Sequence, residues 1–467
     1  MSLDQDICYQ ALKTRDARFD GRFFTAVTST GIFCRPICPA TTPKRENCEF
    51  YPSASAALNA GFRPCLRCRP ETAPDSGAWL GSEAVVKRAL RLIEEGALDD
   101  DKKLTDLCDR LGVGERHLRR LFQRYLGAAP KQIAQTRRLM FAKHLLCQTD
   151  ASITEIASAC GFNSQRRFND AYKSAFDLNP SQERKKGGTG TRADKAIILR
   201  FAYRPPYDWE GLLGFFEARS LTPIEWVTQG CYHRRIALGG HHGLVKISHE
   251  PDKNRIKAEI TGLPVCHLRD ISRRIRRLFD VDADPQAIAH DLSHDPALVA
   301  LIEKHPGLRL PGAWDGFEIA VRAIIGQQIS VKGARTICIR FIDRIASGVF
   351  PTPQEVIDTD LDGLGLTQRR IDTLKNLAEN WTGLDVARPV EETIKSLCDL
   401  PGIGPWTAHY IVMRALSEPD IYPVADLGLI RGLEKLNLPA GKKDLEERSQ
   451  MWRPWRAYGA LYLWSLG

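Results

Sequence analysis

The sequence predicts a multidomain protein that is mainly α-helical, with smaller α+β parts. Three observations lead to this prediction. The chain has 467 residues, which is too long for a single hydrophobic core. Two polar stretches, 71–81 and 185–191, separate segments of different composition and read as linkers. Apolar residues recur at three- and four-residue spacing in the middle and last parts of the chain, whereas strand-like runs stand at 196–202 and near 243–248.

Four parts are expected in order along the chain. Residues 1–72 form a small α+β domain rich in loops and cysteines, and 83–186 form a helical domain. Residues 193–284 form a β-containing subdomain, and 285–467 form a helical domain that runs to the end. A hydrophobic content of 43% and a charged content of 26% are typical of a folded globular protein.

The charge of the chain points to a polyanionic partner. The net charge is +9 at pH 7, and the stretch 81–190 holds 20 Lys and Arg against 14 Asp and Glu. No apolar run approaches the ~20 residues of a membrane span, and the first residues lack the basic-then-apolar order of a signal peptide. We therefore expect a cytoplasmic protein with no membrane partner, in which the 13 cysteines form no disulfide framework.

Four cysteines stand apart from the others by their spacing. Cys34 and Cys38 form one close pair, and Cys65 and Cys68 form a second pair about 27 residues later. Two such pairs suit one zinc ion held by four thiolates. A domain of this size has a marginal core, so a bound metal would help it fold. On spacing alone, a closed and inert structural site is an alternative.

The residues around these cysteines carry a resemblance. Thr30-Gly31-Ile32-Phe33-Cys34-Arg35-Pro36-Ile37-Cys38, Arg45-Glu46-Asn47 and the segment 60–68 closely resemble the N-terminal domain of the Ada family. The resemblance implies that Cys34 accepts methyl groups from DNA methyl phosphotriesters, with Cys38, Cys65 and Cys68 as the other zinc ligands. Methylation of Cys34 would change the charge of the four-thiolate zinc site from −2 to −1 and favour DNA binding.

The middle of the chain contains two similar helix–glycine–helix patterns, at 104–122 and 153–168. Their apolar positions form core, and their polar positions form exposed faces. The arrangement resembles the tandem helix-turn-helix of AraC-type regulators over roughly 84–184, and it implies major-groove reading of promoter DNA. RNA polymerase would be a partner if the protein is an activator. The residues expected to contact DNA are Arg116, Arg119 and Arg120 in the first unit, and Gln165 and Arg166 in the second.

A second motif lies near the end of the chain. Leu400-Pro401-Gly402-Ile403-Gly404-Pro405-Trp406-Thr407-Ala408 reads as a tight turn between two helices, with Asp426 about twenty residues later. The backbone N–H groups at the start of the second helix could hold a DNA phosphate. A carboxylate just downstream could stand beside a deoxyribose whose base has left the stack. Taken by itself, the motif could also be a plain structural turn.

Further motifs surround this turn. Residues 204–209, 312–318, 325–330 and 452–464 resemble the AlkA family of alkylpurine DNA glycosylases, within the helix-hairpin-helix superfamily, over about 194–467. The resemblance implies that Asp426 is the catalytic carboxylate and that Gly402 and Gly404 grip DNA. It places Gln328 at the position that wedges into the emptied stack. It also implies a base pocket lined by Trp406, Tyr410 and Trp464.

The implied chemistry is excision without strand cleavage. Trp406 stands where strand-cleaving members of the superfamily carry a lysine nucleophile. A 3- or 7-alkylated purine is cationic and a good leaving group, and aromatic faces attract it. Asp426 would stabilise the developing oxocarbenium ion or orient a water molecule at C1′.

These expectations give one main hypothesis and two alternatives. The main hypothesis is a monomeric alkylation-repair protein acting on double-stranded DNA. It would excise 3-methyladenine and related purines, accept methyl groups at Cys34 in a suicidal transfer, and regulate transcription. The first alternative is an alkylation-sensing activator whose C-terminal module only binds DNA. The second is a structural DNA binder held together by zinc, which would leave Asp426 unexplained.

Overall fold

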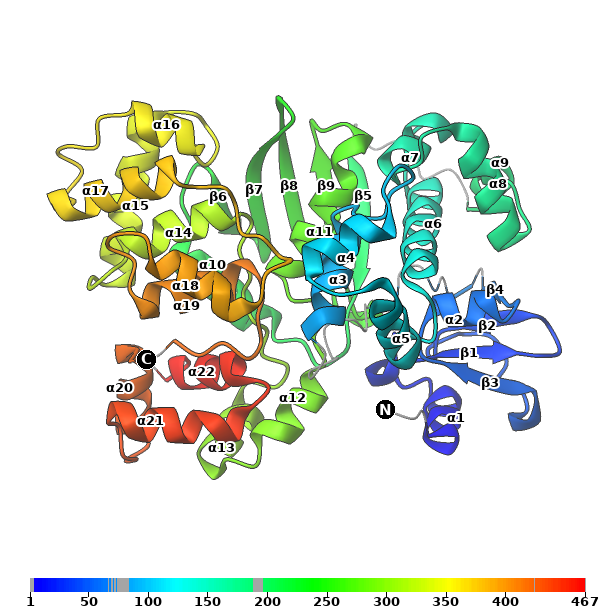
Figure 1. Ribbon diagram of the computed structural model, residues 1–467. Coiled ribbons are helices and arrows are strands. Elements are labelled where there is room, and N and C mark those ends of the chain that lie inside the picture. Colours follow the sequence, from blue (N-terminus) through cyan, green and yellow to red (C-terminus); the bar gives the residue numbers. More distant parts are fainter. Residues whose placement is uncertain are drawn as a thin grey trace. The chain divides into compact units, whose positions relative to one another are not determined.

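The computed structural model describes residues 4–65, 67–68, 70, 73, 84–187, 196–423 and 425–466 (Figure 1). The chain divides into two compact units. The first comprises Met1–Pro205 with Glu250–Arg273, and the second Pro206–His249 with Arg274–Gly467. Helices dominate the described residues, so the predicted multidomain, mainly α class is confirmed. The expected linker 71–81 lies outside the described residues except for Ala73. Within the described ranges, no helix is long and apolar enough to cross a membrane.

The first unit begins with a small α+β domain around a sheet of order β3-β1-β2-β4. Its elements are α1 (Gln5–Thr14), η1 (Ala17–Phe19), β1 (Phe24–Val27), β2 (Ile32–Cys34), η2 (Arg45–Asn47), β3 (Cys48–Tyr51), α2 (Ala54–Asn59) and β4 (Arg63–Pro64). Strand β1 is antiparallel to β2 and β3, whereas β2 and β4 are parallel, with Phe33 opposite Pro64. Because parallel neighbours end at the same edge of a sheet, Cys34 and Cys65 leave it side by side.

The helical part of the first unit contains both predicted helix–turn–helix pairs. Its helices are α3 (Ala84–Glu94), α4 (Leu104–Leu111), α5 (Glu115–Leu126), α6 (Pro130–Gln148), α7 (Ile153–Ala159), α8 (Gln165–Phe176) and α9 (Pro180–Gly187). Helices α4 and α5 meet at Gly112, and α7 and α8 meet after Gly161. Helix α9 continues to Gly187, so the first residues of the expected linker 185–191 are helical, and its last four lie outside the described residues.

An antiparallel strand pair completes the first unit, made of β5 (Ile197–Ala202) and β9 (Arg255–Thr261). The 3-10 helices η5 (Pro251–Lys253) and η6 (Val265–His267) flank β9, and α11 (Leu268–Leu278) follows η6. Arg269 at the start of α11 reaches the helical domain, where its Nη1 lies 2.7 Å from Asp99 Oδ2. Arg273 makes a longer ion pair of 3.4 Å with Glu95.

The second unit carries three antiparallel strands and most of the remaining helices. The strands are β6 (Glu225–Thr228), β7 (Cys231–Leu238) and β8 (His241–Glu250), with β7 paired to both others. The helices are α10 (Trp209–Arg219), α12 (Pro285–Leu292), α13 (Pro296–Lys304), α14 (Gly316–Ile325), α15 (Val331–Ile345), α16 (Pro353–Asp358), α17 (Gln368–Glu379), α18 (Val390–Cys398), α19 (Pro405–Ala415), α20 (Leu427–Lys435), α21 (Lys442–Ser449), η7 (Gln450–Trp452) and α22 (Arg456–Trp464). The expected strand runs near 196–202 and 243–248, and the helical character beyond 285, are confirmed.

A buried ionic cluster joins the strands of the second unit to helix α14. Arg234 on β7 donates through Nη1 to Glu225 on β6 at 3.0 Å and to Glu318 on α14 at 3.2 Å. Arg322, one turn after Glu318, bonds to both carboxylates as well. Since two guanidinium groups face two carboxylates, the buried charges are balanced and hydrogen-bonded, as burial of charge requires.

Candidate functional site

The predicted hairpin is a helix–turn–helix formed by α18, residues 399–404 and α19. Gly402 has φ +86°, and a Cβ added there would overlap the side chain of Thr373. Only glycine fits this position, for both conformation and space. Gly404 has φ −89° and open space where a Cβ would stand, so the fold itself accepts other residues there. Pro405 opens α19, which leaves the next backbone N–H groups at a helix N-terminus suited to an anion.

Asp426 lies at the start of α20 and is held by three donors. Its Oδ1 accepts from the backbone N–H of Leu429 at 3.0 Å and from the indole N–H of Trp464 at 2.8 Å. Its Oδ2 accepts from the indole N–H of Trp406 at 2.7 Å. The residue is only 8% exposed. A carboxylate has about four acceptor positions, so these bonds fix its orientation and leave about one position for a ligand.

The three aromatic residues predicted to form a base pocket meet at this carboxylate. Trp406 and Tyr410 stand one turn apart on α19, with ring centroids 5.4 Å apart and planes 8° from parallel. Tyr410 and Trp464 have centroids 6.4 Å apart at 55°. All three rings are half-buried. Arg414 donates to the Tyr410 hydroxyl at 2.7 Å and to the Gly312 carbonyl at 3.0 Å, which anchors Tyr410 to the interior.

The loop between α14 and α15 is tied to the hairpin. Gln328 lies at the tip of this loop, with φ +56°. Its neighbour Gln327 donates through Nε2 to the Gly402 carbonyl at 3.0 Å and to Thr407 Oγ1 at 3.1 Å. Gln328 is thus held near the hairpin by the hydrogen bonds of Gln327. The sequence motif includes Gln327, but nothing in the motif indicates this role.

The four cysteines predicted to bind zinc come together in the first unit. Their sulfur atoms all lie within 4.8 Å of one another, and the Cys38 and Cys65 sulfurs are 3.8 Å apart. Four ligands at the usual Zn–S distance of ~2.3 Å stand about 3.8 Å from one another, so the donor set fits one zinc ion. Cys34 is half-buried, whereas Cys38, Cys65 and Cys68 are buried.

Arg35 forms hydrogen bonds that hold the Cys68 side of this site in place. Its backbone N–H donates to the Cys68 sulfur at 3.3 Å, and its Nη1 donates to the Cys68 carbonyl at 3.2 Å. Its Nε donates to the buried carboxylate of Asp20 at 2.8 Å. Partners of this kind orient metal ligands, and Arg35 therefore fixes the position of Cys68 through two hydrogen bonds.

The five residues predicted to read DNA in the helical domain all lie on helix surfaces. Arg116, Arg119 and Arg120 lie on α5, and Gln165 and Arg166 on the first turn of α8. Local partners hold some of them, such as Glu115 for Arg119 at 3.0 Å. Asp177, at the end of α8, adopts φ +56° and closes the helix as a glycine would.

Comparisons with known proteins cover nearly the whole chain. The metal binding domain of Ada matches residues 7–71, and a helix-turn-helix domain matches 107–186. The AlkA N-terminal domain matches 198–315, and the HhH-GPD superfamily base excision DNA repair protein model matches 321–457. A Mycobacterium tuberculosis protein described as a probable bifunctional transcriptional activator/DNA repair enzyme AlkA is 37% identical over 99% of this chain and 96% of its own length. The chain belongs to this family.

Two Escherichia coli relatives each match a part of this member of the AlkA-type bifunctional family. DNA-3-methyladenine glycosylase 2 is 33% identical over 56% of this chain and 95% of its own length. The bifunctional transcriptional activator/DNA repair enzyme Ada is 39% identical over 34% of this chain and 43% of its own length. The family resemblances inferred from the motifs are therefore confirmed.

The structure adds residues to this family member's sites that the motifs did not single out. Three such residues donate hydrogen bonds to residues of the sites: Arg35, Gln327 and Arg414. Each lies beside a motif residue or one helical turn from it. The roles assigned to Asp426, Cys34 and the DNA-contacting residues stay predictions.

Proposed function

We propose that the second unit hydrolyses the glycosidic bond of 3-methyladenine and related alkylated purines in double-stranded DNA. The single observation that supports this best is the convergence of Trp406, Trp464 and the hairpin on the buried carboxylate of Asp426. A module that only binds DNA has no need of a buried carboxylate, because an anion beside the phosphates weakens binding. The relative from Escherichia coli, a DNA-3-methyladenine glycosylase, supports the same reaction.

The reaction follows from the positions of these groups. A base turned out of the stack lies against the aromatic rings, whose faces attract a cationic purine. The C1′–N bond breaks, and its electron pair neutralises the purine. Asp426 stabilises the positive charge that develops on the sugar. Three hydrogen bonds hold its carboxylate in one orientation, so the negative charge is in place before the C1′–N bond breaks. Water then bonds to C1′, its proton passes to solvent, and an abasic site remains.

The test is release of 3-methyladenine from methylated duplex DNA by the purified chain and by Asp426→Asn. Release by the wild type, with a fall of at least ~10²-fold in the variant, is expected. Asn keeps the shape of the side chain, so DNA binding should persist. If the folded, DNA-binding wild type releases no base, the first alternative holds, and the protein is a regulator whose C-terminal module binds DNA.

We further propose that Cys34 accepts a methyl group from DNA methyl phosphotriesters. Cys34 is the one half-buried member of the cluster, and the other three cysteines are buried. Zinc bound there would keep the sulfurs deprotonated and nucleophilic. The Cys34 sulfur attacks the methyl carbon, the bond between that carbon and the ester oxygen breaks, and the electron pair leaves with the phosphate. The products are S-methylcysteine and an ordinary phosphodiester.

Transfer of labelled methyl groups from phosphotriester DNA tests this second activity. We expect stoichiometric labelling of Cys34, and its loss in Cys34→Ala while base excision continues. Stoichiometric labelling of another residue in that variant would show that the acceptor is wrongly assigned. We propose in addition that the helix-turn-helix pair binds promoter DNA, which the surface positions of Arg116, Arg119 and Arg120 support. A monomeric state and RNA polymerase as a partner are parts of this proposal.

A further inference from the structure

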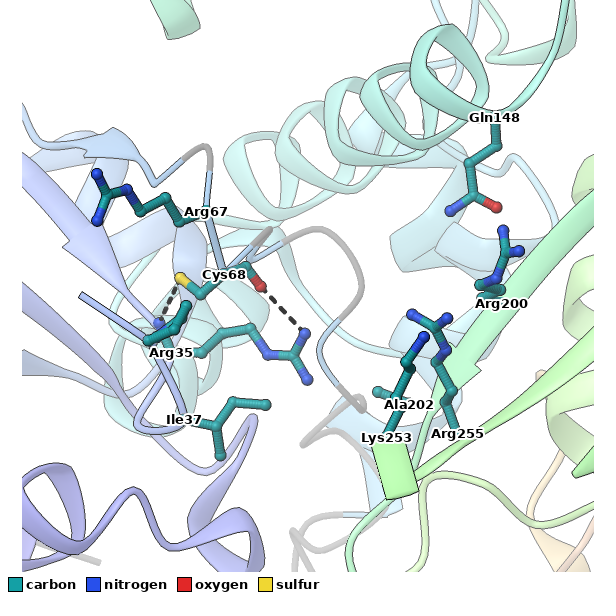
Figure 2. Close-up of a pocket in the computed structure, with 10 residues that line it drawn as sticks. Arg35, Ile37, Arg67, Cys68, Gln148, Arg200, Ala202, Lys253 and Arg255 are labelled. Carbon is teal, nitrogen blue, oxygen red and sulfur yellow. Dashed lines mark hydrogen bonds between the residues drawn. The ribbon is translucent and has the colours of Figure 1, made fainter. Parts of the chain in front are cut away.

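A cationic cleft lies in the first unit, beside the loops that carry the four cysteines (Figure 2). Its volume is about 390 Å³. Arg35, Ile37, Arg67 and Cys68 border one side. The other side is formed by Gln148 at the end of α6 and by Arg200, Lys253 and Arg255 from β5, η5 and the start of β9.

The cleft carries a surplus of positive charge. Five cations line it, and no carboxylate stands among the described residues of the lining. Three of the cations have carboxylate partners, because Asp20 pairs with Arg35, and Glu250 is shared by Arg200 and Arg255. Arg67 and Lys253 are exposed and form no ion pair within the described ranges. The five cations thus face only two carboxylates, and Arg67 and Lys253 are the two without a carboxylate partner among the described residues.

The remaining lining residues suit an anion that has no aromatic ring. Ile37, Pro39 and Ala202 are the apolar members, and the described lining includes no aromatic side chain on which a base could stack. Gln148 has an amide oxygen without a hydrogen-bond partner among the described residues. Rotation of this amide by 180° presents its NH₂ group as a donor to an anion.

We propose that this cleft binds a backbone phosphate of the DNA strand that presents a methyl phosphotriester to Cys34. The proposal rests on the methyl acceptance proposed above. A methylated phosphate is neutral, so electrostatic attraction must come from the charged phosphates on either side of it, which follow every ~3.4 Å along the axis for one strand. The cleft borders both ligand loops, since Ile37 lies between Cys34 and Cys38, and Arg67 between Cys65 and Cys68. Arg200, Lys253 and Arg255 belong to the part that matches the AlkA N-terminal domain, which would thereby extend the DNA surface of the zinc domain.

The first test compares the full-length, zinc-loaded wild type with Lys253→Gln and with Lys253→Gln/Arg255→Gln. The probe is a short duplex with one methyl phosphotriester at a defined position. We expect the double variant to bind about tenfold more weakly at low salt. Its slope of log K against log[salt] should be lower by about one, because one phosphate is no longer neutralised. Lys13→Gln, an exposed lysine of the same unit outside the cleft, is the matched control and should bind as the wild type does. Equal affinities for all of these proteins would overturn the proposal.

The second test locates the phosphate. Replacing single phosphates beside the phosphotriester by neutral methylphosphonates should weaken wild-type binding at one position. The same replacement should have little effect on the double variant, because that variant no longer holds the phosphate. Coupling at no position would contradict a backbone phosphate in the cleft. Saturable binding of ATP or inorganic phosphate that disappears in the variants, with DNA affinity unchanged, would make the cleft a small-anion site instead.

These outcomes distinguish a failure of the cleft proposal from a failure of the proposed methyl acceptance. If the wild type transfers methyl groups but shows no coupling, the cleft proposal fails alone. If it shows coupling but transfers no methyl group, methyl acceptance fails, and the cleft remains a phosphate site of the DNA surface.

Discussion

At the scale of single residues, the orientation of Asp426 is set by two indole N–H groups as much as by its own helix. Trp464 and Trp406 each donate to one carboxylate oxygen, and Leu429 donates a backbone N–H. The two tryptophans were expected to act through their aromatic faces. Their hydrogen bonds also hold the carboxylate in place, and in the mechanism proposed above this fixes its negative charge beside the sugar.

Trp464→Phe separates these two tasks, because phenylalanine keeps an aromatic face but has no N–H group. We expect kcat for base release to fall by ~10–100-fold while the affinity for damaged DNA changes little, since the loss concerns a hydrogen bond to a charged group. Single-turnover rates and binding isotherms measure the two quantities. Trp455→Phe is the matched control, because Trp455 donates to Asp291 at 2.8 Å outside the site. A fall in affinity with an unchanged rate would show that Trp464 acts by stacking alone.

Some residues of the two sites could be predicted from the sequence, and others could not. Asp426, Trp406 and the four cysteines stand in short motifs whose spacing suggests their chemistry. Gln327 and Arg35 are ordinary polar residues, and their importance comes from partners such as Gly402 and Cys68, which are far away in sequence. Such roles depend on tertiary contacts that no local pattern records.

At the scale of elements, the two glycines of the hairpin are under different structural constraints. Gly402 has a positive φ and no room for a Cβ beside Thr373, whereas Gly404 has an ordinary φ and open space. We expect Gly402→Ala to lower the free energy of unfolding by ~1–3 kcal/mol and to weaken DNA binding. Thr373→Ala in the same chain should restore part of the stability by removing the clash. Chemical denaturation measures both effects.

Gly404→Ala is the complementary variant of the hairpin. Its stability should stay within ~0.5 kcal/mol of the wild type, because nothing in the fold opposes a methyl group there. Its DNA affinity should nevertheless fall if a phosphate approaches the turn closely. Unchanged affinity in Gly404→Ala, beside a loss in Gly402→Ala, would mean that the turn contributes only through its shape.

A half-buried carboxylate links three segments of the second unit and makes its stability depend on pH. Asp280, after α11, accepts from Tyr458 on α22 at 2.7 Å and from the Leu310 N–H at 2.9 Å. Burial raises the pKa of Asp280 from 3.8 to about 6. The folded state therefore binds this proton more tightly than the unfolded state. The resulting stabilisation is complete below about pH 4 and is lost as the pH rises through 6, a difference of ~3 kcal/mol.

Asp280→Asn tests this dependence, since the amide does not titrate. The free energy of unfolding of the wild type, relative to the variant, should be lower at pH 8 than at pH 5. Tryptophan fluorescence follows the transition, because eight of the nine tryptophans lie in the second unit. A difference between the two proteins that is the same at both pH values would contradict the assignment.

Elements were predictable from the sequence where their pattern is regular. The helices of the middle domain and the strands at 197–202 and 241–250 follow the expected periodicity. Strand β7 was not predicted, although its residues alternate between buried and more exposed positions. Arg234 occupies a buried position there, so the apolar half of the pattern is interrupted. Its burial is possible only because Glu225 and Glu318 arrive from other elements.

At the scale of the whole molecule, the proposed methylation of Cys34 would connect the charge of the zinc domain with DNA binding. A zinc site with four thiolates carries a charge of −2 and lies beside the cleft in which Arg67 and Lys253 are uncompensated among the described residues. Methylation of Cys34 would remove one negative charge from this region. The attraction for DNA should then rise without any new contact, because the cations beside the site are less offset.

Cys34→Ala distinguishes this charge effect from a contact made by the methyl group itself. The variant with zinc bound by three thiolates has the charge of the methylated site but no methyl group. If charge decides, it should bind an unmodified duplex as tightly as the methylated wild type, several-fold to about tenfold more tightly than the unmethylated protein at about 50 mM salt. The difference should shrink at about 0.5 M salt through screening. The zinc content of each sample is measured as well, so that only proteins with one bound zinc ion are compared. Binding no tighter than that of the unmethylated wild type would show that the methyl group acts by contact, and the charge of the zinc site would then have no regulatory part.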